Sequence, residues 1–344
     1  MSEKIENLLG EDRTFDPPSS IVENANATQE WFDLANEDRL AYWQKQALER
    51  ITWYKEPKEI LDDSDAPFYK WFKDGELNLA YNCLDRHLET DADRIAFYWE
   101  GEPGDSQEIT YQDLYERVCK LSNGLKELGV KKGDRIAIYL GMTPEIVISM
   151  LACARIGAVH SVVFGGFSAE ALADRINDAE AKVVITADGA WRRGDIVPLK
   201  QNVDDSLKLT DHIESVIVVK RTENEVTMVD GRDYWYSELV DKQEADCEPE
   251  VMNAEDMLYI LYTSGTTAKP KGIVHTQAGY LTGVTTTHSA VFDVKEDDIY
   301  WCAADCGWVT GHSYIVYGPL ANKTTSVMYE GAPNAPDEKR LWSI

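Results

Sequence analysis

The chain reads Tyr262-Thr263-Ser264-Gly265-Thr266-Thr267-Ala268-Lys269-Pro270-Lys271-Gly272 between two short apolar runs. The run before it, 257–262, has the length and β-forming residues of a strand, and 272–275 is predicted to form a second strand. The loop between them offers hydroxyl, ammonium and backbone N–H donors, which a polyphosphate needs. It is not a Walker A loop, because no Gly-Lys-Ser/Thr follows Gly265 at the required spacing. A solvated hairpin of small residues remains the alternative on composition alone.

The charge of the chain limits its partners. Of the 344 residues, 61 are acidic and 34 are basic, which gives a formal net charge of −27. A field of this sign repels nucleic acids and anionic membranes, so neither is expected as a partner. The acidic residues are spread along the whole chain, as in proteins from salt-rich cytoplasm, where high ionic strength screens the self-repulsion. An acidic mesophilic protein is the alternative.

Cysteine usage and hydropathy predict a cytoplasmic protein. The six cysteines match no zinc-site spacing and several lie in apolar runs, so we expect reduced, buried thiols and no metal ligands. The first residues contain no apolar segment typical of a secretory signal. No membrane span is expected either.

The order of the segments predicts the fold class. Residues 31–87 are rich in aromatic residues at helical spacings, which indicates short amphipathic helices packed on a larger body. From Ile95 onward, strand-length apolar runs alternate with helical patterns, which predicts an α/β fold with a parallel, doubly wound sheet. An acidic, hairpin-like insertion is expected at 221–255. The expected strands are 95–100, 135–140, 158–164, 182–187, 215–220, 298–303 and 324–330. Helices are expected to begin after Thr110, Pro144 and Ser168 and near Asp204, and two more are expected at 277–291 and 310–320.

A second informative segment reads Tyr300-Trp301-Cys302-Ala303-Ala304-Asp305-Cys306-Gly307-Trp308-Val309-Thr310-Gly311-His312-Ser313-Tyr314. Two tryptophans and a Thr-Gly-His turn between a strand and a helix indicate a small apolar pocket with a polar rim. A tight turn in the core is the alternative that composition alone would favour.

Together with 82–87, 164–168 and 330–334, these segments resemble the AMP-forming acetyl-CoA synthetases of the adenylate-forming (acyl-CoA synthetase) superfamily. The likeness runs from about Trp31 to the last residue. It implies the large α/β N-terminal domain of adenylate-forming enzymes, with doubly wound sheets and flanking helices. On this basis 1–90 is expected to be a helical, aromatic-rich extension and 91–344 an AMP-binding domain that is incomplete at the C-terminus, with the family's small C-terminal domain absent.

The resemblance implies a ligase that converts acetate, ATP and CoA to acetyl-CoA, AMP and pyrophosphate through an acetyl-adenylate. Mg²⁺ would accompany ATP, and no covalent enzyme intermediate is needed, so no catalytic residue and no metal ligand is assigned. Propionate or another short acid, transfer to a carrier thiol, and a non-catalytic fragment that binds nucleotide or CoA are the alternatives. The chain alone is expected to be inactive, and its oligomeric state is left open.

The same resemblance assigns three groups of site residues. The ATP phosphates would be bound by Ser264, Gly265, Thr266, Thr267, Lys269 and Lys271. The acyl pocket would be lined by Trp308, Val309 and Thr310. CoA would be bound by Gly165, Gly166, Arg192, Arg193, Thr310 and Asn334. The chain departs from the family pattern at Ala268, where Gly is usual, and at Asp195, where a second Arg is usual.

Overall fold

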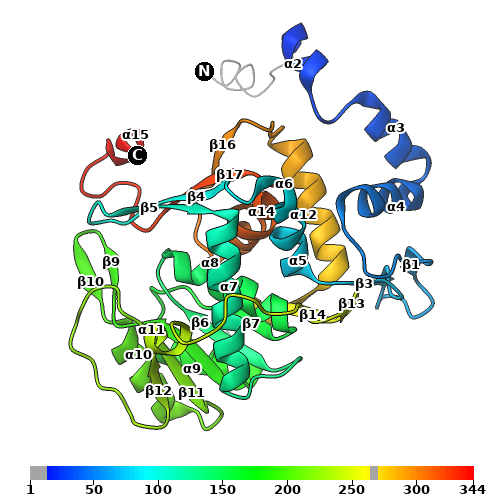
Figure 1. Cartoon of the computed structure of the whole chain (residues 1–344). Helices are drawn as coiled ribbons and strands as arrows, with labels where there is room; N and C mark the ends of the chain where they lie inside the picture. Colours follow the sequence, from blue (N-terminus) through cyan, green and yellow to red (C-terminus); the bar gives the residue numbers. More distant parts are fainter. Residues whose placement is uncertain (1–13, 264–269) are drawn as a thin grey trace, which may run out of the picture.

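The computed structural model describes residues 14–263 and 270–344, which form two larger sheets and the helices around them (Figure 1). Within this part, the larger sheet has seven strands in the order β12-β11-β8-β6-β7-β14-β15. Neighbouring strands are parallel except β14 and β15, which are antiparallel. The predicted α/β class with a doubly wound sheet is confirmed. The strands are β6 (Arg135–Tyr139), β7 (Val159–Val162), β8 (Val183–Ala187), β11 (Ser215–Val219), β12 (Asp233–Trp235), β14 (Met257–Thr263) and β15 (Lys271–Thr276).

Helices cover both faces of the larger sheet. α8 (Pro144–Ile156) links β6 to β7, whereas α9 (Ala169–Ala179) links β7 to β8 in the opposite direction. Because crossovers between parallel strands are right-handed, opposite directions place these helices on opposite faces. α10 (Leu199–Ser206) packs beside β8, and α11 (Tyr236–Val240) packs beside β11. Every residue of β8 and β11 is therefore buried, which accounts for their runs of Val and Ile.

The helix ends follow local rules that the sequence predicts. α7 (Tyr111–Glu127) begins with a capping box in which Thr110 Oγ1 accepts from Asp113 N at 3.0 Å. The Asp113 carboxylate in turn accepts from Thr110 N at 3.2 Å. α8 begins with Pro144 at its first position and ends at Gly157, whose φ of 73° only glycine adopts without strain.

The smaller sheet contains β16 (Ile299–Trp301), β17 (Thr325–Tyr329), β4 (Ile95–Glu100) and β5 (Ser106–Thr110) in that order. β5 was not predicted, because its first three residues are polar and exposed at the edge of the sheet. α12 (Gln277–Val291) lies where the sequence predicts it. The single helix expected at 310–320 is three successive helical segments: α13 (Val309–Gly311), the π-helix η2 (His312–Tyr317) and α14 (Gly318–Ala321).

The insertion at 221–255 does not contain the hairpin that the sequence suggested. Residues 233–235 form β12, which pairs in parallel with β11 at the edge of the larger sheet. An edge position suits so short a strand, because only one of its sides needs hydrogen-bond partners from the sheet.

The N-terminal region consists of helices and very short strands, some of which enter the common core. Its elements are α2 (Ser19–Asn24), α3 (Gln29–Glu37), α4 (Arg39–Arg50), β1 (Leu61–Asp62), β2 (Lys70–Trp71), β3 (Glu76–Leu77), α5 (Leu79–Cys83) and α6 (Asp85–Asp91). Leu79, Ala80 and Cys83 of α5 are fully buried in the same core as α8. Asn78 caps α5 and donates from its amide to the backbone oxygens of Ala154 and Arg155 at 3.1 Å. The boundary expected near residue 90 stays a prediction.

The remaining short elements are β9 (Ala190–Arg192), β10 (Asp195–Val197), η1 (Leu207–Leu209), β13 (Met252–Asn253) and α15 (Arg340–Ser343). Figure 1 shows the hairpin of β9 and β10 extending from the larger sheet toward the ends of β4 and β5 in the smaller one.

Candidate functional site

The topology predicts where a ligand binds. The chain leaves β6 toward β7 on one side and leaves β8 toward β11 on the other, so the direction of winding reverses between β6 and β8. Ligands of doubly wound sheets bind beyond the carboxyl ends of the strands at such a point. A narrow pocket lies there, lined by residues that follow β6, β7 and β8, together with Asp305 and Glu330.

Gly165 and Gly166 line this pocket after β7. A Cβ on Gly165 would lie 3.2 Å from the backbone oxygen of Leu140, and one on Gly166 would lie 2.5 Å from Cε1 of Phe164. A side chain at either position would therefore require its neighbours to shift. Close backbone approach to a ligand, which the sequence predicted for these glycines, stays a prediction.

The Phe164 ring links Arg192 to Trp308. The Arg192 guanidinium lies 5.2 Å from the centre of the Phe164 ring, and that ring lies 6.1 Å from the Trp308 ring. Trp308 is 51% exposed and Val309 is 48% exposed, and Thr310 beside them is also exposed. Burial raises the pKa of Asp305, and the Arg192 charge opposes this shift. The predicted acyl-pocket residues thus lie beside part of the predicted CoA site.

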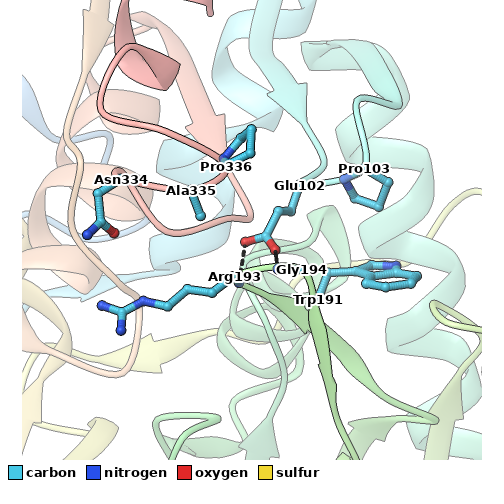
Figure 2. A pocket seen from close by; sticks show the side chains of 8 residues that line it. All are labelled: Glu102, Pro103, Trp191, Arg193, Gly194, Asn334, Ala335 and Pro336. Atoms are coloured by element: carbon cyan, nitrogen blue, oxygen red, sulfur yellow. Dashed lines mark hydrogen bonds between the residues drawn. The ribbon is translucent and has the colours of Figure 1, made fainter.

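Arg193 and Asn334 line a second cavity of about 580 Å³ (Figure 2). It opens on the other side of the β9–β10 hairpin, whose Trp191 borders both this cavity and the narrow pocket. Arg193 and Gly194 form the turn of the hairpin with φ angles of 56° and 81°. Positive φ at both central residues matches the twist of a two-residue hairpin. Five of the six predicted CoA residues therefore divide between two neighbouring pockets, and Thr310 is not among the residues that line either of them.

Asp195, which replaces the family's second Arg, is exposed on β10 and pairs in register with Arg192. Its carboxylate therefore stands on the same hairpin as the two arginines, and the number of positive charges there is lower than the family pattern implies.

Sequence reasoning missed Glu102, which lies at the centre of Figure 2. Its carboxylate accepts from the backbone N–H groups of Arg193 at 2.9 Å, Gly194 at 2.6 Å and Ala332 at 3.1 Å. The segment Gly101-Glu102-Pro103-Gly104 indicates only a turn, and nothing in it shows which residues the Glu102 side chain would reach.

A buried ion-pair network lies behind Glu102. The Arg221 guanidinium pairs with Glu330 at 2.5 Å and with Asp105 at 2.9 Å. The Glu330 side chain is fully buried, and this burial raises its pKa although the bonds from Arg221 oppose the shift. The network joins the turn after β4, the second residue after β11 and the first residue after β17.

The predicted phosphate loop is described only at its ends. Ser264, Gly265, Thr266, Thr267 and Lys269 lie outside the described residues, as does Ala268. Both flanking strands form as the sequence predicts, and in the structure they pair with Thr263 opposite Lys271 and Tyr262 opposite Gly272. Lys271 is exposed at the start of β15.

A buried cluster of histidine and tyrosine rings lies beneath the β14–β15 hairpin. The Tyr259 ring centre lies 4.6 Å from that of His275 and 4.5 Å from that of His312. His160 Nε2 lies 2.5 Å from the Tyr317 hydroxyl. Burial lowers the pKa of His312 to about 4, so this ring is neutral at physiological pH. The cluster connects the hairpin to η2, and the sequence analysis did not identify it.

In residues 14–263 and 270–344, no group of three or more His, Cys, Asp or Glu side chains is arranged to hold a metal ion. Nor does any helix in these ranges combine the length and apolar character that crossing a membrane requires.

Comparison with known proteins matches two family models to almost the whole chain. Residues 84–344 match the AMP-binding enzyme family, and residues 17–83 match the acetyl-coenzyme A synthetase N-terminus. Among curated relatives, the acetyl-coenzyme A synthetase of Streptomyces avermitilis is 59% identical over 345 residues, covering 100% of this chain and 53% of the relative. Those of Pasteurella multocida and Chromobacterium violaceum are 55% and 50% identical, with 98% and 99% of this chain and 53% of each relative covered. The chain spans about half the length of these relatives.

Proposed function

The chain belongs to the AMP-binding enzyme family, and from this premise we propose that it is part of an AMP-forming acetate–CoA ligase. Its match to the acetyl-coenzyme A synthetase N-terminus supports acetate as the acid. The names of the relatives support the same substrate.

In the proposed reaction, an acetate oxygen attacks the α-phosphorus of ATP, which enters as its magnesium complex. The bond to the β-phosphate breaks, and pyrophosphate leaves with the electron pair. The CoA sulfur, after losing its proton, then attacks the acetyl carbon, and AMP leaves with the electrons of the broken carbon–oxygen bond. Such reactions depend on positioning and on stabilisation of charge rather than on a protein nucleophile.

The proposal gives the predicted residues distinct tasks. Lys271, together with Ser264, Gly265, Thr266, Thr267 and Lys269, would bind the β- and γ-phosphates. Trp308, Val309 and Thr310 would form one wall of the acetate pocket. CoA would be bound by Gly165, Gly166, Arg192, Arg193, Thr310 and Asn334.

Among the structural observations, the arrangement of the two pockets gives this division of tasks its strongest support. Gly165, Gly166 and Arg192 line a pocket together with Phe164, whose ring lies 6.1 Å from that of Trp308, and the neighbouring cavity is lined by Arg193 and Asn334. Two adjoining pockets suit a long ligand that carries a thiol at one end and phosphates toward the other. Each pocket is lined by an arginine, and a guanidinium group binds phosphate bidentately.

A ligase for propionate or another short acid is the second candidate. The exposure of Trp308 and Val309 supports it, because these side chains alone leave one side of the acyl pocket open. The length of the acid would then be set by residues outside the described part of the chain.

We also propose that the protein works in a reducing, salt-rich cytoplasm. All six cysteines are free thiols, and five of them are buried. The net charge of −27 supports a setting in which dissolved salt screens the repulsion.

The test uses an enzyme of the relatives' full length that carries this sequence. Exchange of labelled pyrophosphate into ATP is measured with formate, acetate, propionate and butyrate, and thioester formation is then measured with CoA. Acetate should give the fastest exchange and an AMP-linked thioester. Faster exchange with propionate would favour the second candidate, and the absence of exchange with all four acids would contradict both.

A further inference from the structure

Three separate chain segments meet at the Glu102 carboxylate. Glu102 itself lies in the turn after β4, and Oε1 accepts from Gly194 N at 2.6 Å. Oε2 accepts from Arg193 N at 2.9 Å and from Ala332 N at 3.1 Å. One side chain therefore holds the tip of the β9–β10 hairpin against the segment that carries Asn334.

The turn that carries Glu102 is itself firmly anchored. Gly101 N donates to Asp105 O at 2.7 Å, and the Asp105 carboxylate pairs with Arg221. Glu102 N donates to the buried Glu330 carboxylate at 3.3 Å. The contacts of this turn hold the Glu102 carboxylate in place independently of the hairpin, so the carboxylate restrains the hairpin tip.

This restraint determines where Arg193 points. Arg193 has a left-handed backbone with φ of 56°, and its amide is fixed on Glu102. Figure 2 shows its side chain extending away from Glu102 toward the side of the cavity where Asn334 lies. Arg193 is exposed, so its guanidinium is accessible to a ligand.

We propose that Glu102 is a positioning residue for the phosphate-bearing part of CoA. This proposal rests on the proposed function, because the cavity lined by Arg193 and Asn334 is taken as part of the CoA site. Glu102 acts through the hairpin: it fixes two left-handed residues in one orientation, so that Arg193 does not lose backbone freedom when the anion binds. Preorganisation of this kind increases affinity by reducing the ordering cost.

A simple charge argument predicts the opposite effect. A carboxylate beside a phosphate site would weaken binding by repulsion, and its removal would then tighten the complex. Three N–H donors, however, surround the Glu102 oxygens and compensate their charge. The two possibilities differ in sign, so one experiment separates them.

The experiment measures binding of CoA and of dephospho-CoA, by calorimetry in high salt, to an enzyme of the relatives' full length that carries this sequence. The variants are Glu102→Ala, Glu102→Gln, Arg193→Ala and the double variant Glu102→Ala/Arg193→Ala. Glu108→Ala is the matched control, because Glu108 is an exposed carboxylate on the neighbouring strand β5. Thermal melting shows that each variant is folded. Amide hydrogen exchange at Arg193 and Gly194 reports the restraint directly.

Glu102→Ala should weaken CoA binding about tenfold, which is the scale of one charge-assisted hydrogen bond. Glu102→Gln should lie between wild type and Glu102→Ala, since its amide oxygen still accepts one bond, and Glu108→Ala should bind as wild type does. The double variant should be no weaker than Arg193→Ala, because Glu102 acts through Arg193. Exchange at Arg193 and Gly194 should accelerate only in the Glu102 variants.

Each other outcome overturns a specific statement. If wild type binds neither CoA nor dephospho-CoA, the proposed function fails. If wild type binds CoA but Glu102→Ala binds equally well or more tightly, only the positioning role is wrong. Additive losses in the double variant, or unchanged exchange at the hairpin tip, would likewise refute it.

Discussion

Replacing Arg221 by Met should destabilise the protein by an amount that depends strongly on pH. The substitution removes every donor that Arg221 directs at Glu330 but keeps an apolar side chain of similar length. The Glu330 side chain is fully buried, and the Arg221 side chain is 15% exposed. Breaking a buried pair by removing one partner costs roughly 3–5 kcal/mol, because an uncompensated charge remains. We expect about 3 kcal/mol at pH 8, at the lower end, because Arg221 retains some contact with water.

The sign of the pH dependence follows from the direction of the Glu330 shift. Burial already raises the pKa of Glu330 above its ordinary value, and the bonds from Arg221 limit this rise. Without Arg221 the pKa rises further, so the folded variant favours the protonated acid. A group whose pKa is raised in the folded state contributes most to the stability of the protein below its unfolded-state pKa, and this contribution is lost as pH rises through the folded-state pKa. The variant should therefore approach wild type near pH 5 and differ most at pH 8.

Urea unfolding of wild type and Arg221→Met at both pH values in molar KCl provides the assay. Lys208→Met is the control, since its pair with Asp205 leaves the two side chains 72% and 43% exposed and should contribute little to stability. The double variant Arg221→Met/Glu330→Gln should recover part of the loss, because no buried charge remains. An equal loss at pH 5 and pH 8, or a loss no larger than that of the control, would refute the reasoning.

Three further predictions concern the proposed site and the charge. Lys271→Ala should slow acid-dependent pyrophosphate exchange in a full-length enzyme about 10- to 100-fold, because one charge-assisted phosphate contact is lost; an unchanged rate would exclude a phosphate contact. Arg192→Ala/Arg193→Ala should raise the CoA concentration required for thioester formation and spare pyrophosphate exchange, whereas equal damage to both steps indicates a structural role. The melting temperature should rise steeply between dilute buffer and molar KCl, as the Debye length falls from about 30 Å to about 3 Å; a flat profile favours a mesophilic protein.

Much of the larger sheet could be predicted, because its signals are local. β6, α8 and β7 are apolar segments separated by Pro144 and Gly157, and both residues mark helix ends in any fold. The capping box of Thr110 and Asp113 is equally local, since the two residues are three positions apart. These elements begin and end within one or two residues of the predicted positions.

The missed elements are those whose formation depends on partners outside their own segment. β5 consists largely of exposed polar residues and is a strand only because β4 lies beside it. β12 has three residues and pairs with β11, so its direction depends on the edge that the sheet leaves open. Likewise Glu102 and Arg193 are 91 positions apart, and no pattern within either segment indicates their contact.

Arg192 and Arg193 show why a site needs the fold as well as the motif. In the sequence they form one basic pair, and a single role was predicted for both. Arg192 is the last residue of β9, where it lies over the Phe164 ring near Trp308. Arg193 is the first residue of the turn, where its left-handed backbone and Glu102 direct it into the larger cavity. The two guanidinium groups therefore serve different parts of the proposed CoA path, and the turn between them, rather than their shared charge, determines this division.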